Sequence, residues 1–148
     1  MIRLALDSDL DLLVELMGRF YRETGTAMAP AEARRAFAEL IADPGLGRVW
    51  VLEADGQPAG YLVLTLGFSL QYGGRDAFVD DLYVLPEHRD RGLGGAGLER
   101  ARETCAALGV RALHLVVAPD NPRARAHYLR SGFEPVAMEL LSRPIDPA

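Results

Sequence analysis

The fold is decided by Asp76-Ala-Phe-Val-Asp80-Asp81-Leu-Tyr-Val-Leu85-Pro-Glu-His-Arg89-Asp-Arg-Gly92-Leu-Gly94-Gly95-Ala-Gly97. Its first ten residues predict a long strand, residues 86–91 predict a loop, and the glycine cluster opens a helix that ends at Gly109. Residues 111–117 return as a strand. The two strands are therefore expected to pair in parallel across the helix, as in a crossover unit of an α/β (α+β) domain.

The segments on either side of this unit predict a mixed sheet flanked by helices. Apolar periodicity and turn residues predict strands at residues 2–6, 48–53 and 59–65. They predict helices at residues 10–20, from Pro30 until the stop at Asp43, and from Pro122 to Gly132. Asp55-Gly56 favours a tight hairpin between the second and third strands. Residues 133–142 alternate enough for one or two final strands. No repeat or linker interrupts the chain, so residues 1–148 are expected to form a single domain.

Composition and charge narrow the classes of function. The chain is 49% hydrophobic and 25% charged, with a net charge of −5. The acidic balance argues against a nucleic-acid partner and suits a cationic substrate. No apolar run approaches the roughly 20 residues of a membrane span, and the start lacks a signal-peptide pattern. We expect a cytoplasmic protein without a membrane partner.

Cys105 is the only cysteine, and it is expected to pack in the core. The three histidines are scattered along the chain and predict no metal site.

The glycine cluster predicts a phosphate site. Small residues at a helix start let unpaired backbone N–H groups approach an anion, and the helix dipole favours negative charge there. Two alternatives remain: glycines that only permit close packing, and a dinucleotide fingerprint, because Gly92, Gly94 and Gly97 fit G-x-G-x-x-G with Asp120 as a ribose-binding acid. The long connection from Val84 to Gly92 disfavours the dinucleotide reading, since that fingerprint follows its strand directly. No Gly-Lys-Ser/Thr follows, so the cluster is not a P-loop.

Three motifs in order resemble the GNAT family of N-acetyltransferases. The glycine loop matches Arg/Gln-x-x-Gly-x-Gly/Ala, a strand and proline precede it, and Asn121 to Phe133 is similar to the family's Asn-x-x-Ala-x-x-x-Tyr-x-x-x-Gly-Phe. The resemblance implies a mostly antiparallel sheet of six to seven strands, opened into a V and flanked by about four helices. It also implies acetyl-CoA as co-substrate and a homodimer in which final strands pair between subunits.

The resemblance further assigns residues to the cofactor and to the reaction. Those expected at the cofactor are Leu82, Tyr83, Val84, Arg89, Asp90, Arg91, Gly92, Leu93, Gly94, Gly95, Ala96, Asn121, Ala124 and Tyr128. Tyr128 is expected to protonate the leaving thiolate. The alternative for Tyr128 is core packing against the sheet.

Asp80 and Asp81 are the candidates for the base that neutralises an attacking ammonium. Alternation along a strand puts them on opposite faces, so at most one faces a given cleft. Similarity to the polyamine-acetylating branch favours Asp80, acting through a water. The family has Glu there, so the shorter side chain leaves the assignment open, and both carboxylates can instead neutralise Arg75 and Arg89.

The expected acceptor is a small cationic primary amine, from similarity of residues 68–83 to the polyamine and thialysine acetyltransferases. The residues expected to line its pocket are Tyr21, Glu23, Tyr72, Asp80 and Asp81, which combine carboxylate and aromatic contacts. Protein N-termini, amino acids and aminoglycosides remain alternatives. A different class also stays open: a catalytically silent acyl-CoA-binding module.

Overall fold

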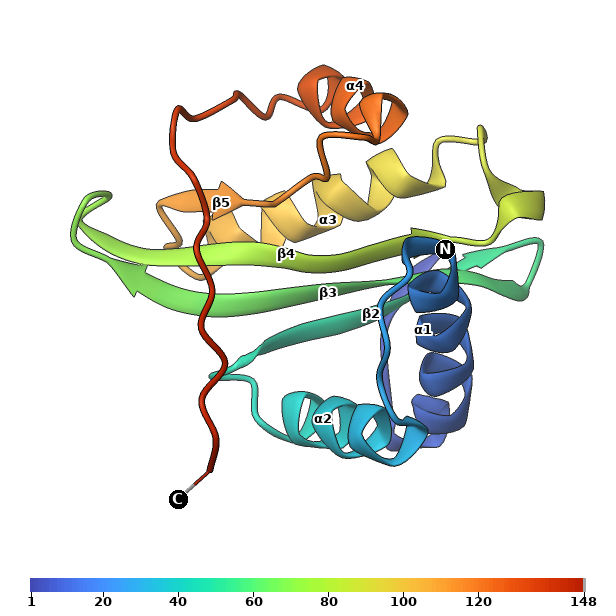
Figure 1. Ribbon diagram of the computed structural model, residues 1–148. Helices are drawn as coiled ribbons and strands as arrows, with labels where there is room; N and C mark the ends of the chain where they lie inside the picture. Colours follow the sequence, from blue (N-terminus) through green and yellow to red (C-terminus); the bar gives the residue numbers. More distant parts are fainter. Residues whose placement is uncertain (148) are drawn as a thin grey trace.

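The computed structural model describes residues 1–147, which form five strands and four α-helices (Figure 1). The strands are β1 (Ile2–Leu4), β2 (Gly47–Ala54), β3 (Gln57–Ser69), β4 (Gly74–Val84) and β5 (Ala112–His114). The helices are α1 (Leu10–Thr24), α2 (Pro30–Ala42), α3 (Leu93–Ala107) and α4 (Pro122–Arg130). Short 3₁₀ turns at Asp7–Asp9 and Pro86–His88 precede α1 and α3.

The strands form one sheet in the order β1-β2-β3-β4-β5. All neighbours are antiparallel except β4 and β5, which pair in parallel as the sequence predicts for strands joined by a crossover helix. Their ladder is short, from Asp76 opposite Ala112 to Phe78 opposite His114. Within residues 1–147, β4 then continues from Val79 to Val84 with no strand on this side. The sheet is therefore open at this point.

Helices cover both faces of the sheet. One core lies between the sheet and helices α1 and α2, where Leu13 and Phe37 pack on Val51 and Tyr61. The other lies under α3, where Leu98 and Cys105 pack against the opposite face, which confirms the expected core position of Cys105. Figure 1 shows α1 and α2 on one side of the sheet and α3 on the other, with α4 beyond α3.

A β-bulge at Asp80 changes the direction of the side chains that follow it. Val63 pairs with Asp81 but Leu64 pairs with Val79, so Asp80 is an extra residue on β4. Strict alternation would put Val79 and Asp81 on one face. Instead Val79 packs in the α3 core, whereas Asp81 reaches Tyr21 of α1 on the other side. The bulge therefore presents the acidic pair to α1, where the charge of Asp80 also acts on Tyr21. The expectation that alternation puts Asp80 and Asp81 on opposite faces is wrong, because the extra residue interrupts the alternation.

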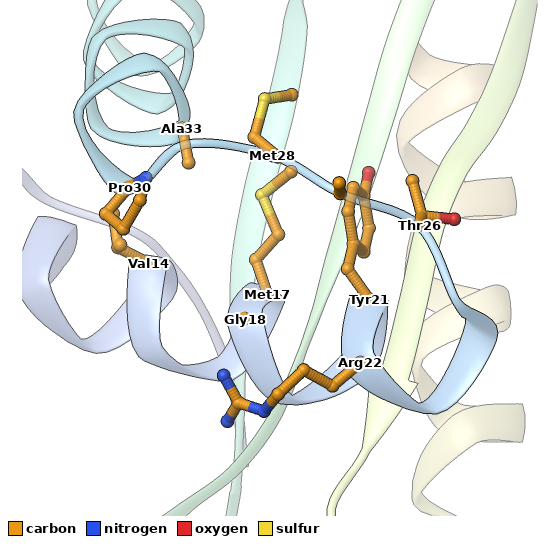
Figure 2. A pocket seen from close by; sticks show the side chains of 10 residues that line it. Val14, Met17, Gly18, Tyr21, Arg22, Thr26, Met28, Pro30 and Ala33 are labelled. Carbon is orange, nitrogen blue, oxygen red and sulfur yellow. The ribbon is translucent and has the colours of Figure 1, made fainter.

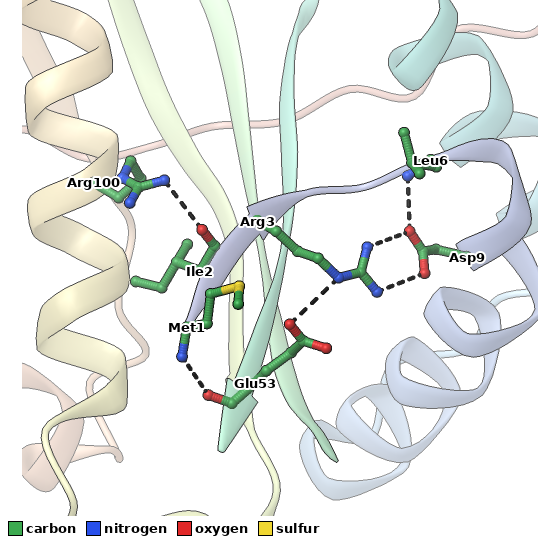
Figure 3. Close-up of polar contacts among 7 residues, drawn as sticks. All are labelled: Met1, Ile2, Arg3, Leu6, Asp9, Glu53 and Arg100. Carbon is green, nitrogen blue, oxygen red and sulfur yellow. Dashed lines mark hydrogen bonds and ion pairs between the residues drawn. The ribbon is translucent and has the colours of Figure 1, made fainter. Parts of the chain in front are cut away.

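A polar cluster fixes the N-terminal strand to α1 (Figure 3). Asp9 is only 7% exposed, and its carboxylate accepts hydrogen bonds from both terminal nitrogens of Arg3, at 2.8 and 2.9 Å, and from the backbone N–H of Leu6 at 2.8 Å. The Arg3 hydrogen bond lowers the pKa of Asp9. Arg3 also pairs with Glu53 at 3.4 Å. The cluster joins β1, β2 and the start of α1.

The sequence predictions of the elements hold with two exceptions: the strand expected over residues 111–117 is only Ala112–His114, and the C-terminal end differs. The fold class, the hairpin and the four helices are confirmed, but the sheet has five strands in residues 1–147 rather than six or seven. The one or two strands expected in residues 133–142 are wrong: that segment is extended, almost wholly exposed and outside the sheet (Figure 1). Apolar alternation alone does not make a strand, because backbone groups need a ladder partner. Within residues 1–147 no helix meets the length and hydropathy of a membrane span.

Candidate active site

A groove of about 850 Å³ lies where β4 and β5 diverge. Its walls come from the end of β4, the start of α3, the segment after β5, helix α4 and the last turn of α1. The predicted cofactor residues that line it are Leu82, Tyr83, Val84, Arg89, Asp90, Gly92, Leu93, Gly94, Gly95, Asn121, Ala124 and Tyr128. Three motifs that are distant in the sequence therefore meet at one groove, of a size typical for small-molecule and cofactor sites.

The glycine loop forms the anion-binding end of this groove. Gly92 caps α3 with φ of 77°, a left-handed conformation that favours glycine. A side chain at Gly94 would lie 3.3 Å from Cε1 of His127, so glycine lets α4 approach the helix start. Leu93, Gly94 and Gly95 bring the first N–H groups of α3 to the groove, and these have no partner inside the helix. The cradle fits a pyrophosphate.

Two predicted cofactor contacts are placed differently. Arg91 does not line the groove and instead lies 3.4 Å from Asp55, on the exposed β2–β3 hairpin. The N–H of Ala96 donates to the carbonyl of Gly92 at 3.0 Å, because it is already the first intrahelical hydrogen bond of α3. The Ala96 N–H is therefore already paired, and the Arg91 side chain points to the hairpin rather than to the groove.

Arg89 links the groove to α1. Its Nε donates to the carbonyl of Val84 at 2.9 Å, its guanidinium lies 3.1 Å from Glu23, and it stacks over the Tyr83 ring at 5.7 Å. The hydrogen bond from Tyr83 lowers the pKa of Glu23 most, and the hydrogen bond from Arg89 lowers it further. Val84, one of the predicted cofactor residues, therefore already accepts one hydrogen bond through its carbonyl. Glu23 serves as a partner of Arg89 at the groove rather than as part of the acidic pair.

The acidic pair lies immediately before the groove-lining Leu82. Asp81 accepts hydrogen bonds from the hydroxyls of Tyr61 at 2.8 Å and Tyr21 at 3.1 Å. Burial raises the pKa of Asp81 to about 6. The hydrogen bond from Tyr61 opposes this shift, and the charge of Asp80 adds to it. Burial also raises the pKa of Asp80, although its residue surface is largely exposed and no side-chain partner is found for it within residues 1–147. Burial raises the pKa of Tyr21 and Tyr61, the charge of Asp81 raises it further, and the charge of Asp80 adds a smaller effect, so the four groups form one cluster.

Tyr128 faces the groove from α4. It is half-buried, packs edge-on to Phe133 with ring centroids 6.2 Å apart, and burial raises its pKa. Its hydroxyl has no hydrogen-bond partner in the described part of the chain. Asn121 accepts the Ala124 N–H at 3.2 Å and caps α4, which fixes the helix that carries Tyr128. A protonated phenol is thus held in the groove wall.

Tyr72 is separate from the other predicted acceptor residues. It lies in the β3–β4 turn and packs on His114, with ring centroids 5.1 Å apart. The sequence reasoning missed Tyr61, because only the β3–β4 register reveals that its hydroxyl reaches Asp81. It also missed His127, whose position over Gly94 depends on how α4 folds back onto α3.

Comparison with known proteins identifies the architecture. The sequence profile described as the Acetyltransferase (GNAT) family matches residues 11–133. The chain belongs to this family. It is an N-acetyltransferase, the acetyl donor of the family is acetyl-CoA, and the dinucleotide reading of the glycine cluster is wrong.

Individual relatives differ in what they are named for. A mycothiol acetyltransferase of Beutenbergia cavernae is 36% identical over 76% of this chain and 36% of its own length. A thialysine N-epsilon-acetyltransferase of Bos taurus is 33% identical over 57% of this chain and 52% of its own length. The chain thus spans about a third to a half of these two relatives. An uncharacterized N-acetyltransferase, YhfO of Bacillus subtilis, is 28% identical over 90% of this chain and 89% of its own length.

Several solved structures share the fold. An integron cassette protein from a salt-marsh metagenome is 41% identical, with a TM-score of 0.88 over 99% of this acetyltransferase and 91% of its own chain. An aminoglycoside N-acetyltransferase in complex with CoA is 17% identical, with a TM-score of 0.85 over 97% of this chain and 93% of its own.

Among residues 1–147, no cluster of His, Cys, Asp and Glu is arranged to hold a metal ion.

Proposed function

We propose that this acetyltransferase acetylates the primary amine of a small cationic acceptor at the opening between β4 and β5. The observation that carries the proposal is the acidic pair Asp80–Asp81, which the bulge brings to the α1 side directly beside the cofactor groove. Two carboxylates and two tyrosine hydroxyls attract and orient an ammonium group. The relatives named for thialysine and for L-2,4-diaminobutyric acid, both small amines, support the same acceptor class.

The residues of the groove suit acetyl-CoA as donor. The N–H groups at Leu93, Gly94 and Gly95 would hold its pyrophosphate, and the unpaired edge of β4 at Leu82 and Tyr83 would face its pantetheine arm. When bound, acetyl-CoA supplies an electrophilic thioester carbonyl and a thiol leaving group.

In this proposal Asp80 accepts the proton of the acceptor ammonium, directly or through one water. An ammonium of pKa near 10 is almost fully charged at neutral pH and cannot attack, so a base raises the neutral fraction at the moment of reaction. Asp80 is the more exposed carboxylate, and its raised pKa makes it a better base than an ordinary aspartate. Asp81, whose oxygens already accept from Tyr61 and Tyr21, binds the cation.

Tyr128 is proposed to supply the proton for the leaving group. Burial raises the pKa of its hydroxyl, so Oη carries its proton at neutral pH. A thiolate has an ordinary pKa of roughly 8.5 and is stabilised by a nearby O–H donor. The raised pKa thus favours a donor rather than a base at this position.

The test is thiol release from acetyl-CoA with a panel of polyamines, lysine analogues, aminoglycosides and short peptides. We expect turnover with one class of small amine, and a fall of at least tenfold in the Tyr128→Phe variant, equivalent to about 1.4 kcal/mol of barrier. CoA binding without turnover across the panel would instead support a silent binding module.

We also propose a homodimer formed through the segment after α4. Residues Val136, Met138, Leu140 and Leu141 are 57 to 84% exposed, and β5 has no strand on its outer side within residues 1–147. Pairing of this segment with the β5 edge of a second copy would cover both. Light scattering over a concentration series tests this: a dimer mass that falls to a monomer mass on removal of residues 134–148 is expected, and a monomer at every concentration contradicts it.

A further inference from the structure

A second hollow, of about 330 Å³, lies between α1 and the segment that leads into α2 (Figure 2). The side chains of Met17 and Tyr21 point from α1 toward this segment, which carries Met28 next to the end of Met17 in the view of Figure 2. This hollow, which we term the α1 recess, is lined by Val14, Met17, Gly18, Tyr21, Arg22, Thr26, Ala27, Met28, Pro30 and Ala33.

The α1 recess and the cofactor groove lie on opposite sides of the end of α1 and share no lining residue. The last turns of α1 stand between them: Phe20 and Glu23 line the groove, whereas Met17 and Tyr21 line the recess. The hydroxyl of Tyr21, which lines the recess, donates to Asp81, so one lining residue contacts the acidic pair directly. An acceptor whose amine lies at the acidic pair can therefore extend the rest of its body into the recess.

Gly18 helps to keep the recess open. It lies in the middle of α1, where glycine is disfavoured by roughly 1 kcal/mol relative to alanine, yet its φ is not left-handed and no backbone approaches it. A Cβ there would meet only the end of Arg22, at 3.4 Å. Helix geometry thus does not require glycine, and the missing side chain leaves room within the recess.

The lining of the α1 recess defines the chemistry of its occupant. Most of it is apolar, from methionine, valine, proline and alanine side chains, which suits a short hydrocarbon chain. Arg22 is the only cationic group in the lining, and no carboxylate within residues 1–147 pairs with it. A guanidinium at the edge of an apolar hollow recognises a carboxylate well.

We propose that the α1 recess binds the non-reacting part of the acceptor, and that the acceptor class is a primary amine on a short apolar chain that ends in a carboxylate. The ammonium lies at Asp80 and Asp81, the chain passes Tyr21 between Met17 and Met28, and the carboxylate pairs with Arg22. This inference rests on the proposed function, because it assumes that the amine reacts at the acidic pair. It distinguishes ω-amino acids from polyamines, which carry no anionic end.

Three six-carbon amines that differ only at the far end test the inference: hexylamine, 1,6-diaminohexane and 6-aminohexanoate. We expect the highest kcat/KM with 6-aminohexanoate. In Arg22→Gln its KM should rise roughly fivefold, with little change for hexylamine. Arg19→Gln is the matched control, because it removes the same charge from the same helix outside the recess lining. Equal effects of Arg22→Gln on all three amines would overturn the assignment of the carboxylate.

Filling the α1 recess tests the site itself. Gly18→Leu should raise KM for the six-carbon amines while KM for ethylamine stays unchanged, and Gly18→Ala, which gains helix propensity, controls for folding. Unchanged KM for every amine in Gly18→Leu would overturn the inference.

A binding measurement separates this inference from the proposed function. Titration of 6-aminohexanoate into the protein should shift the methyl resonances of Met17 and Met28, whether or not acetyl transfer follows. Absence of any shift overturns the recess assignment even if amines are acetylated, whereas a shift without turnover overturns the proposed function and leaves the recess standing.

Discussion

Replacement of Asp81 by Asn should stabilise the protein at neutral pH. The folded structure raises the pKa of this carboxyl from 3.8 to about 6, so at a pH between these values the folded state binds more protons than the unfolded state. The stability of the wild type therefore falls as pH rises from about 4 to about 6, and stays at the lower level above it. One pH unit of separation corresponds to about 1.4 kcal/mol, so ionised Asp81 destabilises the fold by up to about 3 kcal/mol at pH 7.

The Asp81→Asn variant removes this penalty and keeps most of the packing. Its amide oxygen can still accept hydrogen bonds from Tyr61 and Tyr21, which now lie 2.8 and 3.1 Å from the carboxylate. We expect a gain of about 2 kcal/mol at pH 7.5, or roughly 4–8 °C in Tm for a domain of this size. At pH 4 the gain should vanish, because Asp81 is then largely protonated in the folded wild type.

Urea unfolding at half-unit steps from pH 4 to pH 8 measures the effect. The control is Asp7→Asn, which changes an exposed aspartate and should leave the shape of the pH dependence unaltered. The same Asp81→Asn variant should bind the acceptor more weakly, because it lacks the charge that binds the ammonium. Residues at binding sites commonly lower stability in this way. Equal stability of wild type and variant at pH 7.5, or parallel pH curves, would refute the reasoning about Asp81.

Three further substitutions test other parts of the structure. Tyr128→Phe should lower kcat about tenfold with little change in CoA affinity, measured by thiol release and titration calorimetry, and an unaltered kcat would remove Tyr128 as the acid. Gly60→Ala should destabilise the fold by roughly 3 kcal/mol in urea unfolding, because its Cβ would clash with the Tyr83 carbonyl oxygen. A loss below about 1 kcal/mol would contradict the β3–β4 geometry. Asp9→Asn should lower the free energy of unfolding by about 2–3 kcal/mol at pH 7. Because the folded structure lowers the pKa of Asp9, this difference from the wild type should disappear as the pH falls through the acid range below about 3.8. A difference that persists there would count against the ion pair with Arg3.

Local patterns were sufficient to predict most of the fold. Three places show this: the glycine cluster after Pro86, the Asp55-Gly56 turn and the Asn121-Pro122 helix start. At each, residues that favour a turn or a helix start stand beside apolar residues whose spacing fits only a helix or only a strand. Residues 133–142 show where this reasoning fails. Their alternation resembles a strand, but the ladder that a strand needs depends on a neighbour, which the local sequence does not specify.

The cofactor groove could be predicted from the sequence better than the acceptor side. The loop, the end of β4 and Asn121 carry recognisable motifs, so their convergence followed from the resemblance. The role of Asp81 depends on the register of β3 against β4, because one extra residue at Asp80 reverses which face Asp81 occupies. Tyr61 and Gly18 lie in ordinary strand and helix patterns, and only three-dimensional neighbours distinguish them.

The central claim is that the acidic pair removes the proton of a bound ammonium, and the pH dependence of kcat/KM tests it most directly. For the wild type and the preferred amine, we predict a plateau at neutral pH that falls on the acid side as the pair becomes protonated. For Asp80→Asn, we predict low activity at pH 7 that rises about tenfold per pH unit toward the pKa of the amine, roughly 10, because the amine must then lose its proton unaided. Profiles of the same shape in the two proteins would contradict the account.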